Sequence, residues 1–263
     1  MRGLPQGTVP RHWTASAADA IRCAEMDQVG LQQVRTLPLF SGVEERDAQR
    51  LLDGAVLKRC MPETILFTAG ESPEHLHVVL RGLVELFAGA SPRECALLLM
   101  SRGDVFMPAA TLFGEPYLNS ARTLTSASLV CIPAAAARRE FERGGPFAVN
   151  VARALAGHFR MAARSVIDLR LCSAPVRLGR FLLRLVRHAE DETVSLPASK
   201  GKLAARVGMS RETLSRALQT LADEGLVVRG SQIIVRDRDR IERFCAIGEL
   251  VPAGAKSLDV GAI

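Results

Sequence analysis

A short polar run near the C-terminus, Ser210-Arg211-Glu212-Thr213-Leu214-Ser215-Arg216, holds the side chains best suited to chemistry. On a helix, residues four apart lie on one face, so Arg211 neighbours Ser215 and Glu212 neighbours Arg216. A guanidinium can bind guanine O6 and N7 together, and a carboxylate can accept a hydrogen bond from cytosine N4. The run therefore predicts a helix that reads base edges in the major groove. An ordinary solvated helix face is the alternative.

The residues around this run predict the elements that would hold it. Gly208 permits a turn after a short supporting helix over 202–207, and Ser210 is a good N-cap for the next helix. Two short apolar runs, 226–228 and 233–235, predict a hairpin that would form the wing of a winged helix-turn-helix. The recognition helix would bury a stripe of apolar side chains and end at a C′ glycine: Leu214, Ala217, Leu218, Leu221 and Ala222, then Gly225.

The distribution of charge agrees with a nucleic-acid partner. Lys and Arg outnumber Asp and Glu by 15 to 9 over residues 170–246, whereas the rest of the chain has 19 of each, so the whole excess of +6 lies in this segment. Basic surfaces neutralise DNA phosphates. Beside the base-reading side chains, we expect Lys200, Lys202 and Arg206 to contact the DNA backbone.

Composition narrows the class of protein. The chain has no apolar run long enough to cross a membrane, and its first 27 residues lack the pattern of a secretory signal. Its six cysteines are scattered without a C-x-x-C pair, which is typical of a reducing, cytoplasmic setting. It has no P-loop, paired-carboxylate or nucleophile–base motif, so an enzyme with an accessory basic domain is the disfavoured class.

The N-terminal half predicts a β-roll. Residues 1–30 are expected to be a flexible arm, and residues 31–138 contain short apolar runs punctuated by glycines, which is typical of an all-β roll. A tail is expected over 247–263. The runs expected to be strands are Val56–Arg59, Thr64–Phe67, Leu76–Leu80, Leu83–Phe87, Ala96–Met100 and Ser128–Ile132.

A long helix is expected between the roll and the DNA-binding domain, within 139–171. From about Pro146 to Leu171, apolar residues recur at alternating spacings of four and three, which predicts a coiled-coil seam between two protomers. A helix lying on its own domain is the alternative. The seam residues are Ala148, Ala152, Leu155, Phe159, Ala162, Val166 and Leu169. With the DNA-binding domain at 172–246, the whole chain predicts an α+β architecture.

This order of units resembles the bacterial CRP/FNR regulators over about residues 35–245. The resemblance rests on Leu37–Gly42, Leu80–Val84 and, most specifically, Ser210–Arg216. Glu-x-x-Ser-Arg in the recognition helix is similar to the FNR branch. It implies a homodimer on a palindromic TTGAT-like site, with Glu212, Ser215 and Arg216 as readers, and RNA polymerase as a partner.

The same resemblance bears on the effector. Family members that bind cyclic AMP hold it with a Gly-Glu and an Arg-Ser pair, and this chain has Met107-Pro108 and about Tyr117-Leu118 at those places, with Arg122 as a possible substitute. These residues argue against a cyclic nucleotide. They resemble the nitric-oxide-responsive and FtrB-like branches, in which the pocket is apolar.

The cysteines and histidines of the chain bear on other cofactors. An iron–sulfur cluster needs several closely spaced cysteines, and the N-terminal segment has Cys23 alone. Haem remains open: His75 and His77 share a strand face and His158 lies on the long helix, although structural histidines are the alternative reading. Cys95, Cys131 and Cys172 are candidate thiol sensors, with Cys172 the best placed beside Arg170. A constitutive binder whose roll is only a scaffold is a further alternative.

Overall fold

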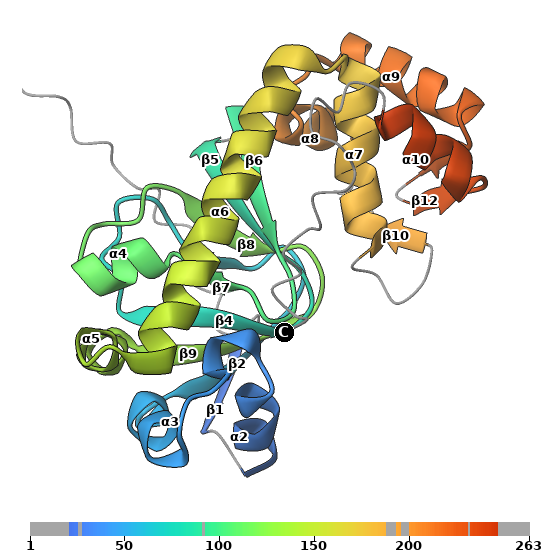
Figure 1. The fold of residues 1–263 in the computed structure, drawn as a ribbon. Helices are drawn as coiled ribbons and strands as arrows, with labels where there is room; N and C mark the ends of the chain where they lie inside the picture. Colours follow the sequence, from blue (N-terminus) through green and yellow to red (C-terminus); the bar gives the residue numbers. More distant parts are fainter. Residues whose placement is uncertain are drawn as a thin grey trace, which may run out of the picture.

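A β-roll, a long helix and a winged helix-turn-helix follow one another along the chain (Figure 1). The computed structural model describes residues 21–25, 28–90, 93–187, 193–195, 200–230 and 232–246. The expected tail over 247–263 lies outside these residues, as does the arm before residue 21. Within the described part of the chain, no helix is long and apolar enough to cross a membrane.

The roll consists of two antiparallel sheets with helices packed at one side. One sheet has the strand order β1-β2-β9-β4-β7 and the other has the order β3-β8-β5-β6. The strands are β1 (Ile21–Glu25), β2 (Val56–Cys60), β3 (Ile65–Phe67), β4 (His75–Arg81), β5 (Val84–Ala90), β6 (Arg93–Met100), β7 (Val105–Phe106), β8 (Ser120–Thr123) and β9 (Ala127–Pro133). The helices are α2 (Gln28–Arg35), η1 (Pro38–Phe40), α3 (Glu45–Leu52), α4 (Pro108–Phe113) and α5 (Ala134–Glu142).

The six expected strands all form, with ends that differ by a few residues. Strand β4 lies between β9 and β7 in its sheet and is buried from Leu76 to Leu80, because one of its faces packs against the opposite sheet and the other against helices. At Gly82, between β4 and β5, a Cβ atom would lie 2.4 Å from the carbonyl oxygen of Ser126, so only glycine fits this turn.

The expectation of a flexible arm over 1–30 is wrong for its last part. Residues Ile21–Glu25 form strand β1, which pairs antiparallel with β2, and helix α2 begins at Gln28. The physical reason is that β2 offers an open edge to which a further strand can bond. That edge belongs to a strand far along the chain, so local composition does not reveal it.

The expected helical segment 139–171 is divided in two. Helix α5 ends at Glu142, and the long helix α6 (Gly145–Leu171) begins after Gly144, which has a φ of 77°. The first turns of α6 are anchored on the roll by buried Phe147, Asn150 and Val151. The Asn150 side chain donates hydrogen bonds to the carbonyl oxygens of Leu39 (3.1 Å) and Ser41 (2.8 Å).

The C-terminal domain has the expected winged helix-turn-helix. Its hairpin β11–β12 is extended by a third strand, β10, which pairs with β12 and which the sequence did not indicate. The elements are α7 (Ala174–Arg187), β10 (Thr193–Ser195), α8 (Lys200–Arg206), α9 (Arg211–Asp223), β11 (Leu226–Arg229), β12 (Gln232–Val235) and α10 (Arg238–Ala246).

The core of this domain continues into the roll. Leu83 of the roll belongs to the same buried cluster as Leu203 and Leu214, and Ala96 and Leu99 of β6 pack against that cluster. The domain therefore rests on the β5–β6 side of the roll, with α8 as its nearest helix (Figure 1).

Candidate nucleic-acid interface and effector region

Helix α9 has the geometry expected of a recognition helix. The hydroxyl of Ser210 caps it by accepting a hydrogen bond from the backbone N–H of Thr213 at 3.1 Å. Leu214, Ala217 and Leu221 are buried, while Leu218 and Ala222 are half-buried. The expected base readers Glu212, Ser215 and Arg216 are all exposed, as are the N-cap Ser210 and Arg211, the other residues of the run expected to contact DNA. The amphipathic pattern thus presents its polar face to solvent.

Glu212 is held in its charged form. Its pKa lies below the usual value because its carboxylate accepts hydrogen bonds from the backbone N–H at the start of α9 and from Ser210, with Arg216 and Arg211 nearby. An ionised carboxylate can only accept hydrogen bonds. Glu212 is therefore suited to the donor N4 of cytosine.

Gly201 of α8 lies directly against the side chain of Arg211, a contact that the sequence did not indicate. A Cβ atom at this residue would lie 2.8 Å from Nη2 and 3.0 Å from Nε of Arg211. The guanidinium of Arg211 therefore lies flat against the first turn of α8. Gly201 gave no signal in the sequence, because a glycine inside a short helix is read only as a weak helix former.

The three basic residues expected on the DNA backbone have different environments. Lys200 is exposed at the start of α8. The side chain of Lys202 lies outside the described part of the structure. Arg206 contradicts the expectation, because its side chain is only 3% exposed and lies against the roll rather than on the outer surface. Helix α8 is covered on that side by β6, and the basic pattern of the sequence cannot show such a contact.

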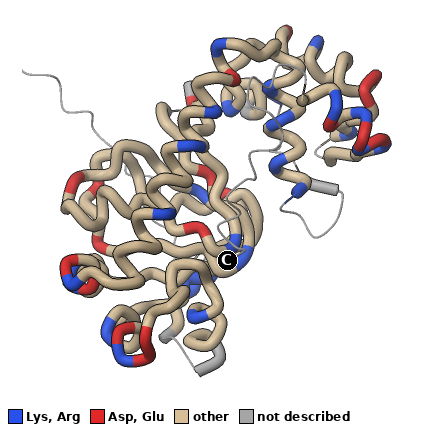
Figure 2. The backbone as a smooth tube through the Cα atoms, in the orientation of Figure 1, with Lys and Arg blue, Asp and Glu red and all other residues tan. Residues whose placement is uncertain are grey.

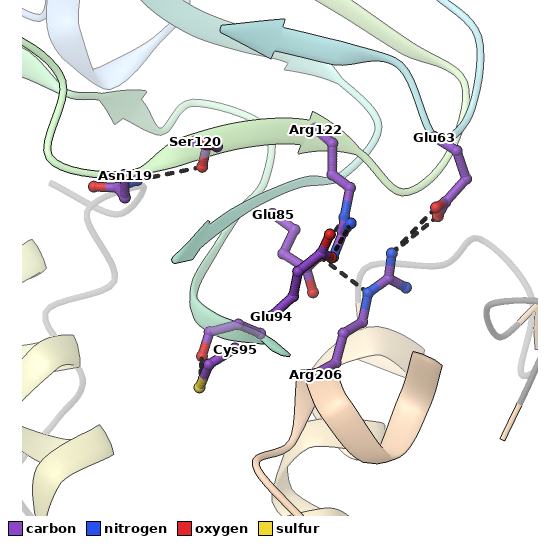
Figure 3. Close-up of polar contacts among 9 residues, drawn as sticks. Glu63, Glu85, Glu94, Cys95, Asn119, Ser120, Arg122 and Arg206 are labelled. Carbon is purple, nitrogen blue, oxygen red and sulfur yellow. Dashed lines mark hydrogen bonds and ion pairs between the residues drawn. The ribbon is translucent and has the colours of Figure 1, made fainter. Parts of the chain in front are cut away.

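Arg206 joins a cluster of charged side chains in the roll (Figure 3). Its Nε lies 3.1 Å from Oε2 of Glu85, and its Nη2 lies 3.1 Å from Oε1 of Glu63. Arg122 of β8 approaches the same Glu85 oxygen to 2.6 Å and also contacts Glu94 at 2.6 Å. We call Glu63, Glu85, Glu94, Arg122 and Arg206 the interdomain charge cluster.

Glu85 is the centre of the interdomain charge cluster. It is fully buried, and its burial raises its pKa although Arg206 and Arg122 oppose the shift. The guanidinium of Arg122 also lies 4.2 Å from the ring centre of Phe87. The two arginines therefore compensate a carboxylate that has no contact with water.

Comparison with known proteins agrees with both halves of the molecule. Residues 176–244 match the family model of the Crp-like helix-turn-helix domain, and residues 57–143 match that of the cyclic nucleotide-binding domain. These matches coincide with the domain that carries α9 and with the roll. With a Crp-like helix-turn-helix domain and a cyclic nucleotide-binding domain, the chain has the domain composition of CRP-family transcription regulators.

Individual relatives are regulators of the same kind. The "Cyclic AMP receptor protein" of Thermus thermophilus is 29% identical over 210 residues, which are 79% of this chain and 96% of that protein. The "CRP-like cAMP-activated global transcriptional regulator" of Mycobacterium tuberculosis is 26% identical over 185 residues, covering 68% and 83%. The Mycobacterium tuberculosis relative is named a transcription regulator, and homologues of this family are not enzymes, in agreement with the expectation from sequence.

Solved structures show the same architecture. FixK2 from Bradyrhizobium japonicum is similar with a TM-score of 0.60 and 25% identity, covering 72% of this chain and 96% of that chain. A CRP/FNR-family regulator from Eubacterium rectale has a TM-score of 0.68 at 17% identity, covering 80% and 99%, and it supports the fold alone.

The effector residues expected from the family resemblance have different environments in the roll. Leu118 is 90% exposed, whereas Tyr117 is buried and stacks on Phe67 with ring centroids 3.8 Å apart. Arg122 is engaged by Glu85 and Glu94. Met107 has a φ of 57° and is the N-cap of α4, whose first residue is the buried Pro108. Met107 packs against the buried cluster that contains Tyr117, whereas Leu118 is exposed and Arg122 is paired with carboxylates.

The candidate metal residues are also separated. His75 and His77 have ring centroids 6.2 Å apart, and His77 is buried against the rings of Phe106 (5.1 Å) and Phe67 (5.5 Å). Burial lowers the pKa of His77 to about 3. Among the described residues, no three His, Cys, Asp or Glu side chains lie close enough to share a metal ion. A haem at His77 would need the space that these aromatic rings fill.

The remaining candidates lie near α6. Burial lowers the pKa of His158, whose surroundings include the backbone of Val105. Burial raises the pKa of Cys172, which contacts Asp168 and Arg180 at the end of α6. Burial likewise raises the pKa values of Cys95 and Cys131. Raised pKa values leave these thiols largely protonated, which does not favour reactivity.

Proposed function

We propose that the chain is a homodimeric transcription regulator that binds a palindromic, TTGAT-like DNA site. The observation that carries this proposal is the capped helix α9, which presents Arg211, Glu212, Ser215 and Arg216 together on an exposed face. Arginine can bind guanine in a bidentate manner, and an ionised glutamate can accept from cytosine. RNA polymerase is part of the proposal as a partner, on the family resemblance alone.

The dimer is supported by the outer half of α6. Phe159 is 75% exposed, Val166 54% and Leu169 56%, and all three lie on the seam expected from the heptad spacing. Ala148 and Leu155 are partly covered by the chain's own roll. The N-terminal part of the seam is therefore compatible both with a coiled coil and with a helix that lies on its own domain. Burial of such side chains against a second α6 removes apolar surface from water. A two-fold dimer would place two copies of α9 on successive turns of DNA.

The site can be tested by selection. The full-length protein is mixed with a library of randomised duplexes, and the bound sequences are recovered and read. We expect an inverted repeat whose halves resemble TTGAT. Recovery of unrelated sequences, or of single half-sites without symmetry, would contradict the proposal.

We propose that the effector of the roll is not a cyclic nucleotide. An anionic cyclic phosphate requires an arginine free to bind it, and Arg122 is already paired with Glu85 and Glu94. Calorimetric titration with cyclic AMP should give no heat of binding.

A haem or redox sensor of the same fold is the second candidate, and a Soret absorption band in the purified protein would support it. A constitutive DNA binder would show neither signal and no change in DNA affinity with any co-purified small molecule.

A further inference from the structure

The interdomain charge cluster joins two domains through one buried carboxylate. Glu85 belongs to the roll, and Arg206 reaches it from α8 of the DNA-binding domain (Figure 3). Both side chains are almost fully buried, with 0% and 3% of their surfaces exposed. If α8 moved away from the roll, Glu85 would lose one of its two cations and Arg206 would lose both of its carboxylates. Separation of a buried charge pair is costly, so the contact favours one relative placement of the domains.

The contact has a rigid connection to the recognition helix. Arg206 is the last residue of α8, and the turn that follows is closed by backbone hydrogen bonds from Gly208 to Ala205 (3.0 Å) and from Met209 to Ala204 (2.9 Å). Ser210 then begins α9. Because little in this turn can rotate freely, the position of Arg206 fixes the direction in which α9 leaves α8.

Apolar contacts around the charge cluster support the same placement. Leu83 is buried in the core of the DNA-binding domain beside Leu203, and Leu99 and Leu124 of the roll pack against that core. Apolar contacts are non-directional, whereas the hydrogen bonds that Nη2 of Arg206 donates to both carboxylate oxygens of Glu63, beside the Glu85 ion pair, require a defined geometry. The charge cluster therefore fixes the relative orientation of the roll and the DNA-binding domain, and the leucines contribute much of the favourable free energy of the contact between them.

We infer that the Arg206–Glu85 ion pair is a positioning contact that fixes the orientation of α9 on the roll and thereby sets the half-site spacing that the dimer recognises. The inference rests on the proposed dimeric DNA-binding function. Two recognition helices held rigidly can match only one separation of half-sites, because a mismatch prevents both from engaging at once. Helices on loosely held domains would tolerate several separations and would bind the best one less tightly.

The test measures the affinity of the full-length protein for a series of duplexes. Each carries two inverted copies of the selected half-site, at the selected spacing or with one or two base pairs added or removed. Wild type should bind one spacing much more tightly than the others. Arg206→Met should lose about 2- to 30-fold at that spacing and less at the others, so that the spacing profile flattens. Affinity for a single half-site should not change.

Three further variants make the result specific. Glu85→Gln alters the contact from the roll side and should flatten the profile in the same way, while Arg206→Lys keeps the charge and should retain much of the preference. Arg187→Met is the matched control, because Arg187 is exposed and pairs with Glu242 within the DNA-binding domain. It removes the same charge and should leave the shape of the profile unchanged. Thermal melting of each variant shows whether it is folded, and if Arg206→Met fails to fold, Glu85→Gln and Arg206→Lys carry the test.

Two outcomes would overturn the inference. In one, Arg206→Met lowers the affinity equally at every spacing and so leaves the shape of the profile unchanged, as is expected of Arg187→Met. In the other, Arg206→Met flattens the profile and Glu85→Gln does not, which would show that Arg206 acts on the DNA itself. Failure of the proposed function looks different, because wild type would then bind the inverted repeat no better than a single half-site, and the inference would fall with it.

Discussion

Arg206 and Arg211 lie on either side of one tight turn, yet their guanidinium groups have different environments. Arg206 is buried among carboxylates of the roll, whereas Arg211 is exposed and rests on the first turn of α8 at Gly201. The type of residue is the same, so the difference arises from what packs against each side chain. The base-reading face of α9 could be predicted because it depends on local spacing. The burial of Arg206 depends on β6 and Glu85, which are remote in the chain.

Gly201→Ala should have opposite effects on stability and on DNA binding. Alanine favours the helix by up to about 1 kcal/mol relative to glycine, so the unfolding free energy should rise or stay the same. The added Cβ would displace the Arg211 guanidinium, which lies within 3.0 Å of that position, so affinity for the selected site should fall. Chemical denaturation and fluorescence anisotropy measure the two effects. A variant with unchanged DNA affinity would show that the placement of Arg211 against α8 does not matter.

His77 should make the roll sensitive to acid. Its pKa in the folded protein is about 3, below the ordinary value of 6.5, because the ring is buried. The unfolded chain therefore takes up a proton below about pH 6.5 and the folded chain does not, so folding stability is complete above that pH and falls as the pH is lowered towards 3. The slope is at most about 1.4 kcal/mol per pH unit for this group.

His77→Phe should remove this contribution while keeping the ring contacts with Phe67 and Phe106. Nδ1 of His77 has no hydrogen-bond partner among the described residues, so little should be lost at pH 8. Between pH 8 and pH 5, the unfolding free energy of the variant should fall by about 2 kcal/mol less than that of wild type. Urea unfolding at the two pH values measures the difference. An equal fall in unfolding free energy from pH 8 to pH 5 in wild type and variant would contradict a buried neutral His77.

Among the elements, long periodic segments were predicted best. The long helix α6 and the buried stripe on α9 follow from spacing over many residues, and the hairpin β11–β12 follows from two apolar runs joined by turn residues. Strand β1, helix α4 and strand β10 were not predicted. Strand β1 exists because β2 offers an edge, and α4 is preceded by its N-cap Met107, a non-glycine residue with a positive φ. The pairing of Arg122 with Glu85 joins β8 to β5, and nothing in the spacing of either strand indicates it.

The α6 seam predicts a dimer that a single charge should weaken. Phe159→Glu places a carboxylate at the middle of the seam, on a side chain that is 75% exposed in the single chain and whose burial in a dimer without a partner would be costly. Sedimentation velocity should show a shift from dimer to monomer. Ile167→Glu is the control, because Ile167 is 40% exposed and lies off the seam. Equal effects of the two substitutions, or an intact dimer in both, would contradict the seam.

In the whole molecule, basic residues of the DNA-binding half lie along α7 and on α8 and α9 (Figure 2). DNA affinity should fall steeply with salt, with a log–log slope of about 0.9 for each phosphate neutralised. Lys200→Met should reduce that slope by about one unit, since Lys200 is exposed at the start of α8. Arg206→Met should leave the slope unchanged, because its charge is already compensated by Glu85 and Glu63. A reduced slope for Arg206→Met would place that residue on the DNA.

The central claim is that α9 reads DNA sequence, and it is tested most directly by the ratio of affinities for the selected inverted repeat and for a scrambled duplex at one salt concentration. Wild type should prefer the repeat strongly. Glu212→Ala and Arg216→Ala should each reduce that ratio by about 1–3 kcal/mol per lost base contact, with little change in affinity for scrambled DNA. If wild type bound both duplexes equally, or if Arg216→Ala left the ratio intact, α9 would not be the element that reads the sequence.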